Sequence, residues 1–320
     1  MIATRHYRAV GAILALTFST ADISDGQQLS RQLRTTAEND FFNFWVSPYE
    51  RPDDNYTQGL RLEWDDRRVP SFARRLICRA KAACGSTLEV GQEIYTPTDD
   101  ATGSPAPGER PYAGWLYVKA AAVGATIRTR RDVGVTIGVT GRASLAQQTQ
   151  ESYHRLIDYR PPLGWSYQLP TEPSVAVHAE ESWLFAAPSR GRPSVDLVPW
   201  ANATVGTLRT ALSAGARARV GPGLRHPWLV DERASSWETY LFLGAGARAV
   251  AHDLFLDGTT FRPSVRAERV PFVPSWDAGV SVRYRRLGFE YRVATEGRAY
   301  RGGPSSHSYS GLSAAWWIAR

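Results

Sequence analysis

Apolar and polar residues alternate with a period of two in many segments of the chain from residue 36 onward. In Tyr56–Trp64, one set of positions carries Tyr, Leu, Leu and Trp, and the other carries Thr57, Gly, Arg and Glu. The segment Trp276–Arg285 repeats this division. Because successive side chains of a strand point to opposite faces, the pattern predicts strands with one apolar and one polar face, and it assigns Thr57 to the lumen side.

Counting such segments gives twelve predicted strands. They cover residues 36–45, 56–66, 87–95, 112–128, 132–142, 172–187, 193–206, 208–220, 237–252, 274–285, 287–295 and 306–319. An even number of strands brings both ends of the chain to the periplasmic side of a bacterial barrel. Short turns are expected at Arg130-Arg131 and Arg285-Arg286. Longer outer loops are expected at residues 46–55, 96–111, 143–171, 253–273 and 296–305.

Aromatic residues mark the ends of many of these segments, and this feature favours a membrane barrel over a soluble β-sandwich. They are Tyr56, Trp64, Tyr112, Trp276, Tyr284, Tyr291, Trp316 and Trp317. Interfacial girdles of aromatic residues are typical of outer-membrane barrels. A sheet exposed to lipid must also close, because unpaired backbone groups are not tolerated in hydrocarbon. The predicted fold is therefore an all-β, antiparallel 12-stranded transmembrane outer-membrane β-barrel with a short helix in an extracellular loop.

The first 21 residues differ from the rest of the chain. Arg5 and Arg8 precede the apolar run Ala9–Phe18, and the small residues Ser19-Thr20-Ala21 follow it. This order predicts a secretory signal peptide over residues 1–21 and a single barrel domain over residues 22–320. No stretch approaches the roughly 20 continuous apolar residues that a spanning helix needs. The aromatic content of 11% is too high for a disordered chain.

Charge and cysteine content add two smaller constraints. Removal of the predicted signal peptide, with its two Arg, lowers the formal net charge from +7 to +5, a mild excess that suits anionic lipid head groups. Cys78 and Cys84 are six positions apart, so we expect a disulfide that closes a short loop in an oxidising compartment. Their spacing excludes a CxxC metal or redox site.

Candidate chemistry is concentrated in four polar segments near the predicted outer rim. They are Glu38–Phe42, Asp53–Gly59, Gly91–Pro97 with Glu109–Tyr117, and the loop 143–171. That loop contains a predicted helix over Ser144–Asp158, which Pro161-Pro162 ends. On this helix Gln150 and His154 are one turn apart on the same face, with Gln147 beside them, so we expect them to address one target. The histidines at positions 178, 226, 252 and 307 are assigned to surfaces or turns.

Together these segments resemble a known family, the lipid A 3′-O-deacylases of the LpxR type, across nearly the whole mature chain. The motifs that carry the resemblance are Asn39-Asp40, Tyr56-Thr57-Gln58-Gly59, Gly91-Gln92-Glu93-Ile94-Tyr95-Thr96-Pro97, Arg110-Pro111-Tyr112-Ala113-Gly114-Trp115, Gln150 with His154, and Gly164-Trp165 with Gln168. The resemblance implies a calcium-dependent hydrolase that removes the 3′-linked acyloxyacyl group of lipid A. It also implies a site at the outer leaflet, between the barrel wall and a loop helix.

The resemblance assigns the site to five residues of this chain, namely Asn39, Asp40, Thr57, Gln150 and His154. His154 would be the general base that activates water, because imidazole titrates near neutral pH. Gln150 would orient the substrate or the water, and Asp40 would bind Ca²⁺, which takes hard oxygen ligands. Asn39 and Thr57 would add hydrogen bonds to the oxyanion or to waters on the metal. Basic residues that the family's best-known member places in the loop after its IYTP-like motif have no clear counterpart in Thr98–Gly108.

Several alternatives remain open from the residues alone. Asn39-Asp40 is also typical of an Asx turn, and Thr57 of an ordinary lumen hydroxyl. The chain as a whole also fits a passive barrel, either a small pore or a lipid-binding structural protein. A serine-type outer-membrane phospholipase would use Ser308, Ser310 or Ser313, although no GxSxG motif is present. The expected partners are lipid A or lipopolysaccharide and the outer membrane, with no nucleic acid, and the expected state is a monomer.

Overall fold

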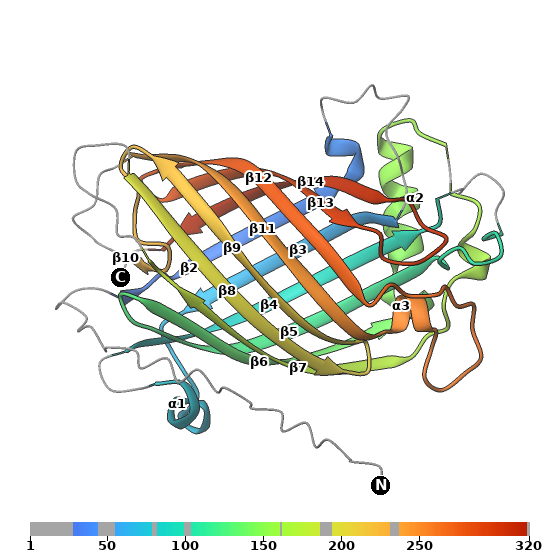
Figure 1. Cartoon of the computed structure of the whole chain (residues 1–320), viewed down its shortest axis with the longest axis horizontal. Coiled ribbons are helices and arrows are strands. Elements are labelled where there is room, and N and C mark those ends of the chain that lie inside the picture. The colour runs from blue at the N-terminus through green and yellow to red at the C-terminus, as the bar shows by residue number, and fades with distance from the viewer. Residues whose placement is uncertain are drawn as a thin grey trace, which may run out of the picture.

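The computed structural model describes residues 28–43, 55–78, 82–98, 104–160, 162–185, 194–230 and 237–318. Twelve antiparallel strands form a closed barrel, as the sequence predicts (Figure 1). The strands are β2 (Gln32–Asn39), β3 (Asn55–Asp66), β4 (Ala83–Thr96), β5 (Ala113–Ala125), β6 (Thr129–Thr140), β7 (Pro173–Trp183), β8 (Ser194–Gly206), β9 (Arg209–Gly221), β11 (Trp237–Asp253), β12 (Phe272–Tyr284), β13 (Leu287–Gly297) and β14 (Ser306–Trp317). The predicted signal peptide lies outside the described residues.

The barrel closes where β14 pairs with β2, so the first and last strands lie side by side. This closure leaves no sheet edge with unpaired backbone groups. One strand prediction and one turn prediction were wrong in detail. The first strand spans 32–39 instead of 36–45, because Asn39 ends it. Arg130 and Arg131 lie inside β6, and the turn is at residues 126–128.

The helical elements are short and lie at the two ends of the barrel (Figure 1). The α-helices are α1 (Ser71–Ile77), α2 (Ala146–Leu156) and α3 (Leu254–Asp257), and the 3-10 helices are η1 (Asp40–Phe42), η2 (Gly141–Ser144) and η3 (Trp165–Tyr167). The predicted helix over 144–158 is confirmed as α2, which lies in the loop between β6 and β7. Among the described residues, no helix has both the length and the apolar composition needed to cross a membrane.

The barrel is apolar outside and polar inside. Leu62, Ile137 and Leu241 are among the strand residues exposed on the outer wall. Inside, charged side chains pair with one another, as Arg219 does with Asp196 through Nε–Oδ1 at 2.9 Å. The apolar outer wall can lie in contact with lipid hydrocarbon. Inside the barrel, ion pairing lowers the free-energy cost of burying each charge.

The prediction that aromatic residues at strand ends form interfacial girdles is only partly confirmed. Trp276, Tyr284 and Trp316 are exposed near strand ends, as a girdle requires. Tyr112 is buried, and the Tyr56 hydroxyl donates to Glu38 at 2.7 Å. A Trp or Tyr at a strand end is therefore a weaker indicator of membrane contact than the alternation of the whole strand.

The periplasmic end is crossed by a second, two-stranded sheet of β1 (Gln28–Leu29) and β10 (Leu229–Val230). Next to β10, Trp228 Nε1 donates to the Thr126 carbonyl at 2.7 Å, and His226 Nε2 lies 3.0 Å from the Ile127 carbonyl. Leu29, Trp228 and Leu229 form a buried apolar cluster. These contacts hold the segment before β10 against the turn between β5 and β6 at the periplasmic end of the barrel.

We expect the packing of the periplasmic segment before β10 to weaken in acid. A carbonyl accepts from His226 Nε2, and Nδ1 accepts from the Leu229 amide at 3.2 Å, so the arrangement needs the neutral ring. Burial lowers the pKa of His226 below the ordinary 6.5. A lowered folded-state pKa gives stability that is complete above about pH 6.5 and is lost as the pH falls toward the folded value. The thermal unfolding temperature of the barrel in detergent should therefore fall between pH 7.5 and pH 5, and His226→Gln should remove most of the part of that dependence that His226 causes.

The disulfide expected from the sequence is present. Cys78 and Cys84 are bonded, with their Cα atoms 5.8 Å apart. Cys78 follows α1 directly, and Cys84 is the second residue of β4. The bond therefore ties the periplasmic helix α1 to the start of a barrel strand.

Candidate active site between the barrel wall and helix α2

The first element of the site is the end of β2, where Asn39 turns the chain out of the sheet. Its Oδ1 accepts from the Phe41 amide at 2.7 Å and so caps η1. This is the Asx-type turn that the sequence left open as an alternative. The turn places Asp40 at the start of η1, where it is 1% exposed. The local role of Asn39 is therefore to position the carboxylate beside it.

The second element is a β-bulge in β3. The register between β3 and β4 shifts between Tyr56 and Gln58, so Thr57 is an extra residue in the ladder. Tyr56 lines the lumen, whereas Thr57 and Gln58 line a cavity beneath α2. The prediction that Thr57 faces the lumen was therefore wrong, because one inserted residue reverses the alternation of a strand. The Thr57 and Thr96 hydroxyls form a hydrogen bond of 2.6 Å.

The third element is α2, which lies close against the barrel. A Cβ at Gly114 would stand 2.2 Å from the Ala146 Cβ, so only glycine permits this approach of the helix to β5. Gln92 Nε2 donates to the Ser144 carbonyl at 2.7 Å and fixes the helix start to β4. These contacts give a structural reason for two of the sequence motifs, Gly91–Pro97 and Arg110–Trp115.

Gln150 and His154 are both buried on the face of α2 that meets the wall. Trp165 Nε1 donates to Gln150 Oε1 at 2.8 Å, which fixes the orientation of the amide. With its oxygen accepting this bond, the Gln150 amide has a fixed orientation in which its NH₂ group is the donor end of the side chain. The Gly164-Trp165 motif therefore has a role in positioning Gln150.

The orientation of His154 is set by the chain that follows its helix. Asp158 has φ 53°, and the turn there brings the Arg160 carbonyl to 2.6 Å from His154 Nδ1. A carbonyl only accepts, so Nδ1 carries the proton and Nε2 is the basic nitrogen of the neutral ring. Tyr159 packs edge-on against the imidazole, with ring centroids 5.2 Å apart. This arrangement suits a general base with a fixed tautomer.

The structure brings the five residues assigned from the sequence into the lining of one small cavity. Those residues are Asn39, Asp40, Thr57, Gln150 and His154. The cavity volume is about 10 Å³, close to what one water molecule needs. Sequence reasoning missed Gln58, which also lines the cavity and has a buried Oε1 without a hydrogen-bond partner. It lies in the same motif as Thr57, but only the bulge turns both side chains to this side of the wall.

The donor atoms of the cavity match the oxygen chemistry of Ca²⁺. Within the described part of the chain, no group of three or more His, Cys, Asp or Glu side chains is arranged to hold a metal. Ca²⁺ also takes amide and carbonyl oxygens, however. The cavity is lined by Asp40, which has a carboxylate, by Thr57, which has a hydroxyl, and by Gln58. The Gln58 Oε1 is buried and has no hydrogen-bond partner among the described residues. These oxygen donors therefore suit a hard cation that is bound by one carboxylate and by neutral oxygen atoms.

The serine alternative finds no matching geometry in the described residues. Ser308 bonds to Thr295, Ser310 to Asn43 and Ser313 to Thr36. None of these contacts is with a histidine, which serine nucleophiles need as a base.

The model of the family described as outer membrane protein LpxR matches residues 10–318. The chain belongs to this family. Among solved structures, LpxR from Salmonella typhimurium is similar at a TM-score of 0.74 with 20% identity, and the match covers 90% of this chain and 100% of that one. The β domain of the Bordetella autotransporter BrkA gives a TM-score of 0.45 at 11% identity, covering 92% and 99% of the two chains. No curated protein matches the chain.

Membership of the LpxR family agrees with the architecture of the barrel. An LpxR-family barrel with an apolar outer wall is a protein of the outer membrane. The connections that carry η1 and α2 then lie at the cell-surface end, because β2 and β6 both run outward from the periplasmic side. The cavity under α2 is thus at the cell-surface end of the barrel, and it is separate from the lumen cavity that Tyr56 lines.

Proposed function

We propose that this LpxR-family protein is a lipid A 3′-O-deacylase that hydrolyses the 3′-linked acyloxyacyl ester of lipid A, with His154 as general base and with Ca²⁺. The observation that carries the proposal is that His154 and Asp40 line one cavity outside the barrel wall, together with Gln150, Thr57 and Asn39. A fatty ester in the outer leaflet reaches this side of the wall without leaving the membrane. All of these groups come from one chain, which fits action as a monomer.

Each side chain of the site has a separate role in ester hydrolysis. Nε2 of His154 takes a proton from the water that attacks the ester carbon, and the Arg160 carbonyl stabilises the imidazolium through Nδ1. When the acyl C–O bond breaks, the imidazolium returns this proton to the leaving 3′ oxygen, which restores the neutral ring. Gln150, with its oxygen held by Trp165, donates its NH₂ toward the oxygen that becomes negative. Asn39 holds the turn that carries Asp40.

Calcium has a defined place in this scheme. Asp40, Gln58 and Thr57 would hold the ion, and bound Ca²⁺ would supply positive charge that stabilises the oxyanion. The protein's part is to present oxygen donors in a cavity with little room for competing water.

Mass spectrometry of lipid A tests the function as a whole. We expect lipid A from a heterologous Gram-negative host to lose one acyloxyacyl unit when the chain is expressed, and fragmentation should assign the loss to the 3′ position. Expression of His154→Ala is the control for effects of the barrel alone. An unchanged lipid A mass, together with conductance in bilayers, would support the passive barrel instead.

We expect Trp165→Phe to lower deacylation by about tenfold, because it removes the donor that orients Gln150 while keeping the aromatic packing against Tyr112. The loss should appear in kcat with little change in KM, since the bond acts on the reacting groups and not on remote binding. Kinetic analysis in mixed micelles checks this. Tyr167→Phe, an exposed aromatic in the same loop, is the matched control.

A further inference from the structure

A second cavity lies inside the barrel, across the wall from the site under α2. Its volume is about 610 Å³, far larger than the cavity at His154. Tyr56 lines it, as do Arg110 from the loop before β5, Leu256 from α3, and Pro304 from the loop before β14. These loops are at the cell-surface end (Figure 1), so the cavity lies in the outer part of the lumen. The proposed deacylase chemistry makes no use of it.

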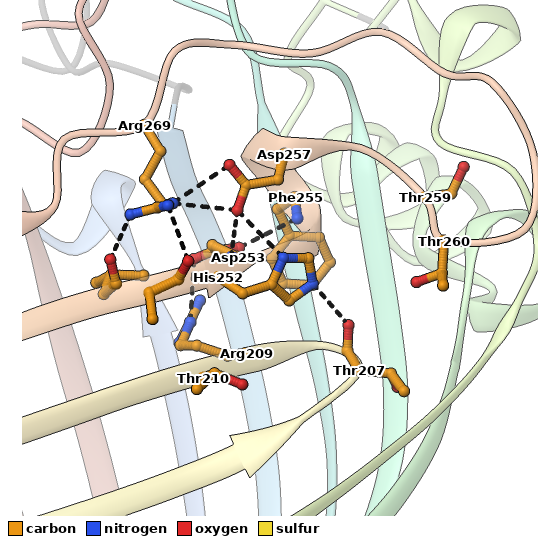
Figure 2. A network of polar contacts seen from close by, with 12 residues as sticks. Thr207, Arg209, Thr210, His252, Asp253, Phe255, Asp257, Thr259, Thr260 and Arg269 are labelled. Atoms are coloured by element: carbon orange, nitrogen blue, oxygen red, sulfur yellow. Dashed lines mark hydrogen bonds and ion pairs between the residues drawn. The ribbon is translucent and has the colours of Figure 1, made fainter.

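Most charged side chains that line this cavity are matched by a partner. Arg61 meets Glu38 at 2.7 Å, Arg209 meets Asp253 at 3.0 Å, and Arg248 meets Glu296 at 3.0 Å. Figure 2 shows the contact between Arg209 and Asp253 at the barrel rim. These pairs offset the cost of burying each charge.

Among the arginines that line this cavity, Arg110 is the one without an ion pair in the described part of the chain. It is 5% exposed, no described carboxylate lies within ion-pair distance of its guanidinium, and its Nε has no hydrogen-bond partner among the described residues. Its guanidinium lies over the Tyr95 ring, 4.4 Å from the centroid. Burial lowers the pKa of Arg110 below its ordinary value, which is a sign of how unfavourable the charge is there. The Nε atoms of Arg248 and Arg292 in the same cavity also lack hydrogen-bond partners.

The position of Arg110 is fixed in advance. Its amide donates to the Glu109 carboxylate at 3.2 Å, and the Tyr300 hydroxyl donates to that same carboxylate. The Tyr95 hydroxyl donates to Glu93 at 2.7 Å, which holds the ring under the guanidinium. A buried cation held this way needs no rearrangement to bind an anion.

The cover of the cavity is also held in place. His252 lies between the Thr207 carbonyl, at 2.9 Å from Nε2, and Asp257, at 3.2 Å from Nδ1 (Figure 2). Arg269 reaches Asp257 at 3.1 Å. These contacts anchor α3, and with it Leu256, to the ends of neighbouring strands. The space beneath α3 is thus a formed cavity and not a gap between loose loops.

We propose that this lumen cavity binds a small polar organic anion, with a carboxylate or phosphate group held by Arg110. The planar guanidinium offers paired donors that match either group. The volume is many times what an inorganic ion needs, and the lining is mostly charged or tyrosine side chains, so the ligand is a polar solute about the size of a monosaccharide. Because the cavity lies in the outer part of the lumen, we expect the solute to enter from the cell surface.

Calorimetric titration of the full chain in detergent tests this inference, with glucuronate, glucose 6-phosphate and uncharged glucose as probes at matched ionic strength. We expect saturable binding of at least one of the two anions and none of glucose. Comparing the two anions tells which group Arg110 prefers. The absence of saturable binding by both anions, or equal binding of glucose, would overturn the proposal.

Arg110→Gln should weaken anion binding by at least about tenfold, because the charged donor is lost. Arg301→Gln is the matched control, since it removes the same charge from an exposed outer loop, where the side chain is 74% accessible and pairs with Glu268. Arg110→Lys keeps the charge without the paired donors, should weaken binding severalfold, and serves if the glutamine variant does not fold. Wild-type affinity in either Arg110 variant would refute the assignment. The outcome is independent of deacylation, which has its own assay.

Discussion

Alanine at His154 should abolish deacylation while the barrel stays folded. The imidazole is the group in the cavity able to take a proton near neutral pH, and its Nδ1 is already committed to the Arg160 carbonyl. Loss of a general base lowers rates by about 10²- to 10⁴-fold, so turnover should fall to the background of the host lipid A. Mass spectrometry of lipid A gives the rate, and heat-modifiable mobility on gels reports the folded barrel.

Two further variants separate the base from the helix that carries it. His154→Asn keeps a donor toward the Arg160 carbonyl but has no basic nitrogen, and it should be as inactive as the alanine variant. Gln147→Ala removes a half-buried side chain of α2 that bonds to Glu151, and it should leave activity near wild type. Substantial deacylation by His154→Asn would eliminate the proposed base.

Removal of Ca²⁺ should stop turnover reversibly, and Asp40→Ala should have the same effect without chelator. Asp40 supplies the carboxylate among the oxygen donors of the cavity, so its loss leaves only neutral ligands for a divalent cation. Loss of oxyanion stabilisation costs about 10²- to 10³-fold in rate. Activity measured in chelator, and again after Ca²⁺ is restored, checks the first part of the prediction.

A direct binding measurement complements the activity assay. Asp40→Asn preserves the shape of the side chain and removes its charge, so Ca²⁺ affinity measured by calorimetry should fall with activity. Glu151→Gln loses one negative charge from the same helix as His154, outside the cavity lining, and should bind Ca²⁺ like wild type. Full turnover in the presence of chelator would point to metal-independent chemistry.

The alternation of residues predicts the barrel well, because each strand must satisfy lipid on one side and a polar lumen on the other. The same reasoning fails where the interior itself carries charge. Arg130 and Arg131 look like a turn in the sequence, but Arg130 pairs with Asp132 inside the barrel, with Nε–Oδ2 at 2.9 Å. When such ion pairs lie in the middle of a strand, the sequence of that strand has the charged composition that is typical of a loop.

The sequence identifies the residues of the site, but it does not show on which side of the barrel wall their side chains lie. The family motifs and the helical spacing of Gln150 and His154 identify the five residues that line the cavity. The side of the wall on which Thr57 lies depends on a single inserted residue, and no local composition signals it. For the same reason Gln58 was missed. The isolation of Arg110 depends on distances between loops, which alternation along one strand cannot report.

The bulge in β3 gives two adjacent residues opposite surroundings, since Tyr56 lines the lumen cavity and Thr57 lines the small cavity beneath α2. Deleting Thr57 would restore the regular alternation of the strand, with Tyr56 still toward the lumen and Gln58 on the opposite face. The shortened strand would keep its place in the ladder, but the cavity beneath α2 would lose one of its oxygen donors.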